Sequence, residues 1–251
     1  YVEYGKENKY DDDIFFQKYS QMSRSQQGLA GAGEWETLRK LLPDFKDKRV
    51  LDLGCGYGWH CIYAMEHGAS SVVGVDISHK MLEVAKEKTH FPQVEYKCCA
   101  IEDVEFPEES FDVILSSLAF HYVADYEILV KKIYRILKSG GKLVFTVEHP
   151  VFTAYGTQDW YYNEKGEILH FRVDSYYYEG KRTAVFLGEK VTKYHRTLTT
   201  YLNTLLSNGF IINHIVEPQP PEYMMDIPGM QDEMRRPMML IVSANKNCYT
   251  T

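Results

Sequence analysis

The stretch Val50-Leu51-Asp52-Leu53-Gly54-Cys55-Gly56-Tyr57-Gly58-Trp59 decides the fold of this 251-residue chain. An apolar run leads into three closely spaced glycines, and helical spacing begins directly after them. This order is typical of a buried β-strand whose carboxyl end turns into a helix. Glycines at such a turn permit positive φ and let a ligand approach the backbone. Because ligands of open α/β sheets bind at the carboxyl ends of strands, we expect a ligand site at residues 54–58.

Strand and helix patterns alternate on both sides of this turn. Apart from residues 49–53, the pattern predicts strands at residues 72–76, 94–98, 111–116, 142–148, 210–217 and 238–244. Helices are predicted at residues 58–67, 78–88 and 125–137 and from Leu198 onward. Strands that alternate with helices favour an α/β fold in which helices cover both faces of a mostly parallel sheet.

The length suits one large domain that carries an insertion. Helical spacing from Trp35 is expected to stop at Pro43, ahead of the first strand. Between residues 150 and 193 aromatic residues crowd among charges, which predicts an inserted β flap of two or three strands. We therefore expect a single domain (residues 1–251) composed of an N-terminal helical arm (1–45), a core (46–149), the flap (150–193) and the C-terminal part of the sheet (194–251).

The charge of the chain disfavours two classes of partner. A formal net charge of −7 gives no overall attraction to nucleic acid or to anionic lipid. The given sequence has no secretory pattern at its start and no apolar run of roughly 18 residues. We expect a cytoplasmic protein, a monomer or homodimer, with neither nucleic acid nor membrane as a partner.

Cysteine spacing predicts no metal site. The five cysteines lack the paired C-x-x-C spacing of zinc sites. We expect them to be reduced and mostly buried.

The residues around the glycine turn favour one ligand over another. Asp76 ends the next predicted strand at about the 20-residue offset at which an acid binds the ribose hydroxyls of adenosine. A dinucleotide fingerprint would require a third glycine where Trp59 stands, and Asp52 would lie close to the pyrophosphate. Beside S-adenosylmethionine the Asp52 carboxylate would instead face, directly or through water, an ammonium group, which is favourable.

This turn resembles the first motif of class I S-adenosylmethionine-dependent methyltransferases of the ubiquinone/menaquinone-biosynthesis kind (methyltransferase types 11, 12 and 25). Three further segments are similar to later motifs of that family and follow in its order, at residues 73–78, 111–122 and 136–141. The resemblance implies a Rossmann-like, seven-stranded sheet whose last strand is antiparallel. It also implies a methyltransferase with S-adenosylmethionine as methyl donor and S-adenosylhomocysteine as product.

The family's motifs imply where the cofactor binds. This chain departs from the family's frequent Gly-Asp-Ala triplet with Cys99-Ala100-Ile101, so the adenine contact is assigned to Ile101 and to the acids after it. The arm is a further candidate, because Tyr19 and Arg24 would fold over the cofactor and Arg24 would bind its carboxylate. The expected cofactor residues are Asp52, Gly54, Cys55, Gly56, Asp76, Ile77, Met81, Ile101, Glu102, Ser116, Tyr19 and Arg24.

Three histidines are candidates for acid–base catalysis, because a neutral imidazole takes a proton near pH 7. His121 follows the fourth predicted strand, His149 the fifth, and His195 lies at the start of the helix near Leu198. A local structural role is the alternative for each histidine.

Several segments, among them Glu148-His149-Pro150 and Tyr194-His195-Arg196-Thr197, resemble signatures of a bacterial subgroup of these enzymes without an assigned substrate. Arg196 and Arg235 are candidates to hold an anionic group of the acceptor, and Tyr161 to form part of an apolar wall. Solvated ion pairs and ordinary packing are the alternative interpretations.

The predicted function is methyl transfer to a small molecule by in-line displacement. Two alternatives stay open, a non-catalytic module that binds the cofactor and a methyltransferase that acts on a protein or nucleic acid. Amino-methylating DNA enzymes usually carry a D/N/S-P-P-Y type run where this chain has Ser116-Ser117-Leu118-Ala119, which disfavours a DNA substrate.

Overall fold

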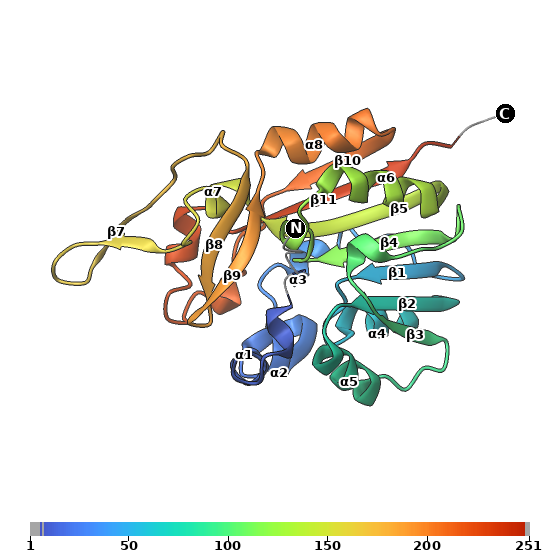
Figure 1. Ribbon diagram of the computed structural model, residues 1–251. Helices are drawn as coiled ribbons and strands as arrows, with labels where there is room; N and C mark the ends of the chain where they lie inside the picture. The colour runs from blue at the N-terminus through green and yellow to red at the C-terminus, as the bar shows by residue number, and fades with distance from the viewer. Residues whose placement is uncertain (1–5, 7, 249–251) are drawn as a thin grey trace, which may run out of the picture.

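The apolar run before the glycine turn forms a central strand of a seven-stranded sheet. The structure is a computed structural model and describes residue 6 and residues 8–248. The strands of this sheet are β1 (Arg49–Leu53), β2 (Ser71–Asp76), β3 (Val94–Cys98), β4 (Phe111–Ser117), β5 (Leu137–Glu148), β10 (Phe210–Val216) and β11 (Met239–Lys246), in the order β10-β11-β5-β4-β1-β2-β3. Neighbouring strands are parallel except at β11, which is antiparallel to both β5 and β10. The predicted Rossmann-like sheet is confirmed (Figure 1).

Helices cover both faces of this sheet. The α-helices are α1 (Asp13–Ser20), α2 (Ser23–Gln27), α3 (Trp35–Leu38), α4 (Trp59–Glu66), α5 (His79–Lys88), α6 (Tyr126–Ile136), α7 (Pro150–Thr153) and α8 (Leu198–Ser207). Because side chains alternate along a strand, Leu51 and Leu53 pack into the core that includes α6 and α8, whereas Val50 packs against α3 and α4. No helix within the described ranges has the length and apolar character needed to cross a bilayer.

Short 3₁₀ helices connect the larger elements. They are η1 (Lys9–Asp11), η2 (Gly28–Gly31), η3 (Ile101–Asp103), η4 (Phe120–Tyr122), η5 (Glu222–Met224) and η6 (Asp232–Arg235).

Some details of the sequence prediction were wrong. The helix that begins at Trp35 ends at Leu38 rather than at Pro43, because Leu41 and Leu42 pack against the core from a turn. The flap contains four strands instead of two or three, arranged as the hairpins β6 (Trp160–Tyr162) with β7 (Ile168–Phe171) and β8 (Gly180–Phe186) with β9 (Glu189–His195). Of the five cysteines, which are all free, only Cys55 and Cys61 are buried.

The N-terminal arm is fixed at the carboxyl end of the sheet. Asp11 accepts hydrogen bonds from Ser78 Oγ (2.6 Å) and from the Lys80 amide (3.1 Å) at the start of α5. Lys18 in α1 donates to the Leu187 carbonyl (3.1 Å) at the tip of the β8–β9 hairpin. Helices α1 and α2 and this hairpin consequently lie beyond the same end of the large sheet (Figure 1).

Candidate functional site

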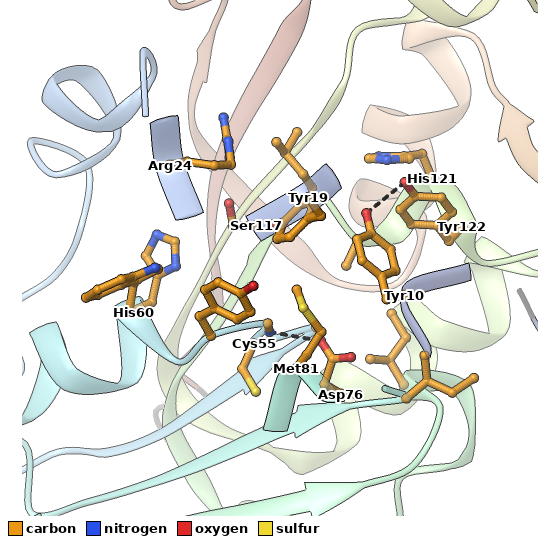
Figure 2. Close-up of a pocket in the computed structure, with 18 of the residues that line it drawn as sticks. Tyr10, Tyr19, Arg24, Cys55, His60, Asp76, Met81, Ser117, His121 and Tyr122 are labelled. Atoms are coloured by element: carbon orange, nitrogen blue, oxygen red, sulfur yellow. Dashed lines mark hydrogen bonds between the residues drawn. The ribbon is translucent and has the colours of Figure 1, made fainter. Parts of the chain in front are cut away.

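A cavity of about 240 Å³ lies where the strand ends, the arm and the β8–β9 hairpin meet. Its wall comes from segments that are far apart in the sequence: the arm, the turn after β1, the end of β2, the segments that follow β3 and β4, and the ends of β5, β8 and β11. Figure 2 shows Arg24 and His60 on one side of the cavity, His121 and Tyr122 on the other, and Tyr19 between them.

The glycines of the turn line the cavity with backbone alone. Gly54 has φ +78°, and a Cβ built there would lie 2.5 Å from the Cβ of Ala119. The amides of Gly54 and Cys55 both donate to the Val75 carbonyl, at 2.8 and 2.9 Å. Any side chain at residue 54 would therefore clash with the segment after β4, so the close approach of these two segments requires glycine.

Asp76 presents a fixed carboxylate to the cavity. Its Oδ2 accepts from the Gly56 amide (2.9 Å) and its Oδ1 from the Ser78 amide (2.9 Å). Burial raises the pKa of this carboxyl, although both amide hydrogen bonds oppose the shift. A carboxylate has about four lone-pair positions, and two remain for donors from a ligand such as the hydroxyls of a ribose.

A paired arginine lies on the arm side of the cavity. Arg24 donates from both terminal nitrogens to Glu34, at 3.1 and 3.0 Å, and the Glu34 side chain is only 3% exposed. Burial and the nearby Arg24 charge lower the pKa of His60 to about 4, against the effect of Glu34, so this imidazole is neutral. Two N–H donors on terminal nitrogens of Arg24 remain after the Glu34 contacts, which suits an anionic ligand group.

The opposite side of the cavity has aromatic rings and a carboxylate. Tyr10 and Tyr122 hydroxyls lie 3.2 Å apart, and Phe186 reaches the cavity from β8. Glu148, the last residue of β5, also lines the wall. Glu148 Oε1 accepts from Lys193 Nζ (2.5 Å), and its Oε2 accepts from Gln158 Nε2 (2.5 Å).

His121 is held against the same carboxylate. The Glu148 amide donates to His121 Nδ1 (3.3 Å), and His121 Nε2 lies 3.9 Å from Glu148 Oε1. Burial lowers the pKa of His121 to about 4 although Glu148 opposes this shift. The ring is therefore neutral at pH 7, and because Nδ1 accepts a hydrogen bond, the proton is assigned to Nε2.

The structure brings most of the predicted cofactor residues to this one cavity. Those that line it are Gly54, Cys55, Gly56, Asp76, Ile77, Met81, Ile101, Glu102, Tyr19 and Arg24. Asp52 and Ser116 do not line it. Ser116 donates to the Leu53 carbonyl (2.7 Å), and the next residue, Ser117, reaches the cavity instead.

Asp52 lies beneath the glycine turn. It is 1% exposed, and its Oδ2 accepts only a weak bond from Cys61 Sγ (3.5 Å). Its Oδ1 has no hydrogen-bond partner among the described residues. Burial and the Asp76 charge raise the pKa of the Asp52 carboxyl to about 7, although the Cys61 contact lowers it. Asp52 is thus not brought to where a ligand ammonium could contact it directly.

We expect Asp52→Asn to change how stability depends on pH. The folded pKa of about 7 lies above the reference value of 3.8, so the native state binds more protons between these values, and wild-type stability falls as pH rises through this window. Relative to the variant, wild type should lose about 2.5 kcal/mol between about pH 5 and pH 8. Urea unfolding at both pH values measures this difference. A pH-independent difference between the two proteins would contradict the expectation.

Two of the three candidate histidines lie outside the cavity wall. His149 caps α7, where its Nδ1 accepts from the Val151 amide (3.0 Å), while its Nε2 lies 2.7 Å from Glu217 Oε1. His195 Nδ1 lies 2.7 Å from Thr153 Oγ1, and its Nε2 2.7 Å from the Tyr176 carbonyl. In each of these two residues, both ring nitrogens have a partner nearby in the structure. Of the three candidates, only His121 lies at the cavity.

The three candidate acceptor residues also lie elsewhere. Arg196 is buried, and its guanidinium donates to the carbonyls of Val123 and of Ala124 (3.0 Å) after η4. Arg235 pairs with Asp232 (3.0 Å), and Tyr161 is 46% exposed on the outer hairpin. Arg196 shapes the segment that carries His121, while the other two residues do not approach the cavity.

The polar group at Glu148 and the neutral ring at His60 were not predicted from the sequence. Glu148 ends β5 at the same sheet edge as Asp76, so its position in the strand was the available signal. No comparable signal exists for Lys193, because it reaches Glu148 from a hairpin strand 45 residues later. Among the described residues, no three His, Cys, Asp or Glu side chains group as a metal site requires.

A parallel sheet with a bare glycine turn, followed by an acid at the end of the neighbouring strand, defines a nucleoside-binding Rossmann-like domain. The methyltransferase domain family matches residues 51–145 of the chain. A Listeria monocytogenes protein assigned to the S-adenosylmethionine-dependent methyltransferases is 58% identical; the match covers 88% of this chain and 99% of that one, with a TM-score of 0.84.

Two further relatives agree with this match. An S-adenosylmethionine-dependent methyltransferase of Mesorhizobium loti is 40% identical, covers 87% of this chain and 100% of its own, and has a TM-score of 0.80. A ubiquinone biosynthesis O-methyltransferase of Coxiella burnetii is 36% identical over 112 residues, which are 44% of this chain and 47% of that enzyme. The chain belongs to the S-adenosylmethionine-dependent methyltransferases. It is an enzyme, and S-adenosylmethionine is its cofactor.

Proposed function

We propose that the enzyme transfers the methyl group of S-adenosylmethionine to a small molecule bound on the Tyr122 side of the cavity. The proposal rests on the elements that cover the site. Residues of the arm, the β8 strand and the segment after β4 all line one cavity. A macromolecular acceptor would require this cover to open, whereas a small molecule can be enclosed by it.

The cavity residues fit the cofactor in charge and in polarity. Gly54 and Gly56 line the cavity, Asp76 suits the ribose hydroxyls, and Arg24 suits the carboxylate of the amino acid part. Ile101 and Glu102 lie on the wall where the adenine would be held. In this proposal the amino acid part lies toward Arg24, and the acceptor lies beyond it, against Tyr122.

The contribution of the chain to the reaction is mainly alignment and exclusion of water. S-adenosylmethionine supplies an electrophilic methyl group carried by a sulfonium. The rings of Tyr10, Tyr19 and Phe186 provide an apolar and electron-rich wall for that region. The contacts of α1 with the β8–β9 hairpin, including Phe15 against Phe186 at 5.7 Å between ring centroids, would keep the arm closed during transfer.

The relative from Coxiella and the charge of the chain support a small acceptor. That relative is a ubiquinone biosynthesis O-methyltransferase, and its match covers part of this chain. The net charge of −7 opposes binding to nucleic acid.

Labelled methyl transfer tests the proposal. The enzyme is incubated with S-adenosylmethionine that carries a ¹³C-labelled methyl group and, separately, with the small-molecule, protein and RNA fractions of a bacterial extract. We expect label in the small-molecule fraction alone. Label that accumulates only in protein or RNA would contradict the proposal, and Asp76→Asn serves as the inactive control.

A further inference from the structure

We propose that Glu148 accepts the proton of a hydroxyl group on the acceptor, so that the methyl group is transferred to oxygen. This inference rests on the proposed function, because it names the chemical class of the small molecule and the group that takes its proton. Glu148 lines the cavity next to His121, 3.9 Å from its Nε2, and His121 lies across the cavity from Arg24 and His60 (Figure 2).

The surrounding contacts hold this carboxylate in one orientation. Lys193 bonds to Oε1 and also to Gln158 Oε1 (3.0 Å), while Gln158 bonds to Oε2. Lys193 is 2% exposed, and its Nζ lies 5.4 Å from the centroid of the Phe186 ring and 5.9 Å from that of the Tyr122 ring. Glu148 itself is 8% exposed and lines the cavity, so its remaining lone pairs are available to a ligand there.

Glu148 rather than His121 fits the role of proton acceptor. His121 Nδ1 accepts from the Glu148 amide, and its Nε2, 3.9 Å from Oε1, carries the proton, so the imidazole has no lone pair for an acceptor proton. Burial raises the pKa of the Glu148 carboxyl, but His121, the Lys193 ion pair and the Gln158 hydrogen bond outweigh burial and lower it. Glu148 therefore stays ionised at neutral pH, and His121 and Lys193 act as positioning residues.

An ionised carboxylate at this point selects among acceptor classes. It would hold an amine as an ammonium, whose pKa of roughly 10 keeps it protonated and unreactive. It would repel a carboxylate, and it would disfavour the thiolate that a thiol must form. A hydroxyl group, by contrast, stays neutral and donates a hydrogen bond to Glu148, which directs an oxygen lone pair elsewhere for attack.

The step balances without a further reactant. The acceptor oxygen forms its bond to the methyl carbon while the carbon–sulfur bond breaks and its electron pair stays on sulfur. The hydroxyl proton passes to a carboxylate oxygen of Glu148. The products are a methyl ether, S-adenosylhomocysteine and a protonated Glu148, which returns the proton to water after release. A weak base is sufficient, because the oxygen becomes strongly acidic as its new bond forms.

The decisive experiment compares variants on the labelled product. The product from the small-molecule fraction is isolated, and carbon NMR identifies the atom that carries the ¹³C-methyl group. We expect label on oxygen, and we expect Glu148→Gln to lower kcat by about 100-fold or more. The double variant E148Q/K193M leaves no unpaired buried charge and should show the same loss. The Kd for S-adenosylhomocysteine should stay within about two-fold of wild type in both.

Glu217→Gln is the matched control, since Glu217 is also a partner of a histidine but does not line the cavity. It should retain wild-type kcat. Label on nitrogen or sulfur, or a Glu148→Gln variant with kcat near wild type, would overturn the inference and leave the proposed function standing. Absence of label from every small molecule would overturn both.

A second measurement does not depend on turnover. The charged or titratable groups that act on Glu148 and His121 are Lys193 from β9, Arg196 beyond it and Tyr201 from α8. In protein with ¹³C-labelled glutamate carboxyls and bound S-adenosylhomocysteine, Glu148 should remain a carboxylate from about pH 8 to pH 5. Lys193→Met should move its titration upward. Protonation of wild-type Glu148 near neutral pH would overturn the inference.

Discussion

Asp76→Asn is expected to weaken the binding of S-adenosylhomocysteine by about 100-fold or more. The carboxylate loses its charge, and one of its two oxygens becomes an amide donor that faces donors on the Gly56 or Ser78 amide and on the ribose. Each hydrogen bond to a charged group contributes about 1.5–3 kcal/mol, and two such bonds account for the expected loss. Isothermal titration calorimetry measures it directly.

Asp112→Asn is the matched control for this substitution. Asp112 also belongs to a strand of the sheet, but it accepts from the Arg49 amide (2.8 Å) and from Lys138 near the amino ends of the strands. Its substitution should leave the affinity within about two-fold of wild type. If Asp76→Asn bound S-adenosylhomocysteine as tightly as Asp112→Asn, the ribose would not be held at Asp76.

The double variant R24M/E34Q is expected to change the affinity for one of two ligands that differ only in the amino acid part. It should weaken S-adenosylhomocysteine by about 10- to 100-fold, because the guanidinium no longer binds the ligand carboxylate. It should leave 5′-methylthioadenosine, which lacks the amino acid part, unchanged. Replacing both partners avoids an unpaired Glu34 carboxylate, which is 3% exposed in wild type.

The exposed pair of Arg39 with Glu36 provides the control for that variant. This ion pair lies outside the cavity, with side chains 49% and 43% exposed, and R39M/E36Q should bind both ligands as wild type does. Calorimetry with the two ligands gives the comparison. An equal loss of affinity for both ligands in R24M/E34Q would show that the arm is disturbed as a whole and that Arg24 does not recognise the carboxylate.

The sheet could be predicted from the sequence because each strand carries its own local pattern. The predicted strand at residues 49–53 has the observed bounds of β1, since an apolar run ends at glycines with positive φ. The predicted end of β5 also agrees, but its start does not. Strand β5 begins at Leu137 and continues through Gly140, which has φ +73°, so the two glycines do not separate helix from strand.

The candidate site was harder to predict from the sequence, because the direction of each side chain decides which residues reach the cavity. Asp52 and Ser116 have the residue types that a cofactor site uses, but Asp52 is buried against Cys61, Ser116 donates to the Leu53 carbonyl, and neither lines the cavity. A single residue likewise separates Glu148, which lines the cavity, from His149, which caps α7. Its residue type suggested a catalytic role for His149, whereas its position after β5 gives it a structural role.

Contacts between distant segments could not be predicted either. The pair of Glu148 with Lys193 joins the last residue of β5 to a hairpin whose pairing depends on the flap. Arg196 showed the properties of an anion-binding residue in the sequence, but carbonyl groups after η4 occupy its donors. These hydrogen bonds of Arg196 depend on tertiary packing, which a local sequence pattern does not show.

The most direct test of the whole account is a crystal structure of the enzyme with S-adenosylhomocysteine. We expect the ribose hydroxyls on the Asp76 carboxylate, the ligand carboxylate within hydrogen-bond reach of Arg24, and the sulfur directed toward Tyr122 and Glu148. A ligand bound outside this cavity, or a ribose that does not contact Asp76, would contradict it.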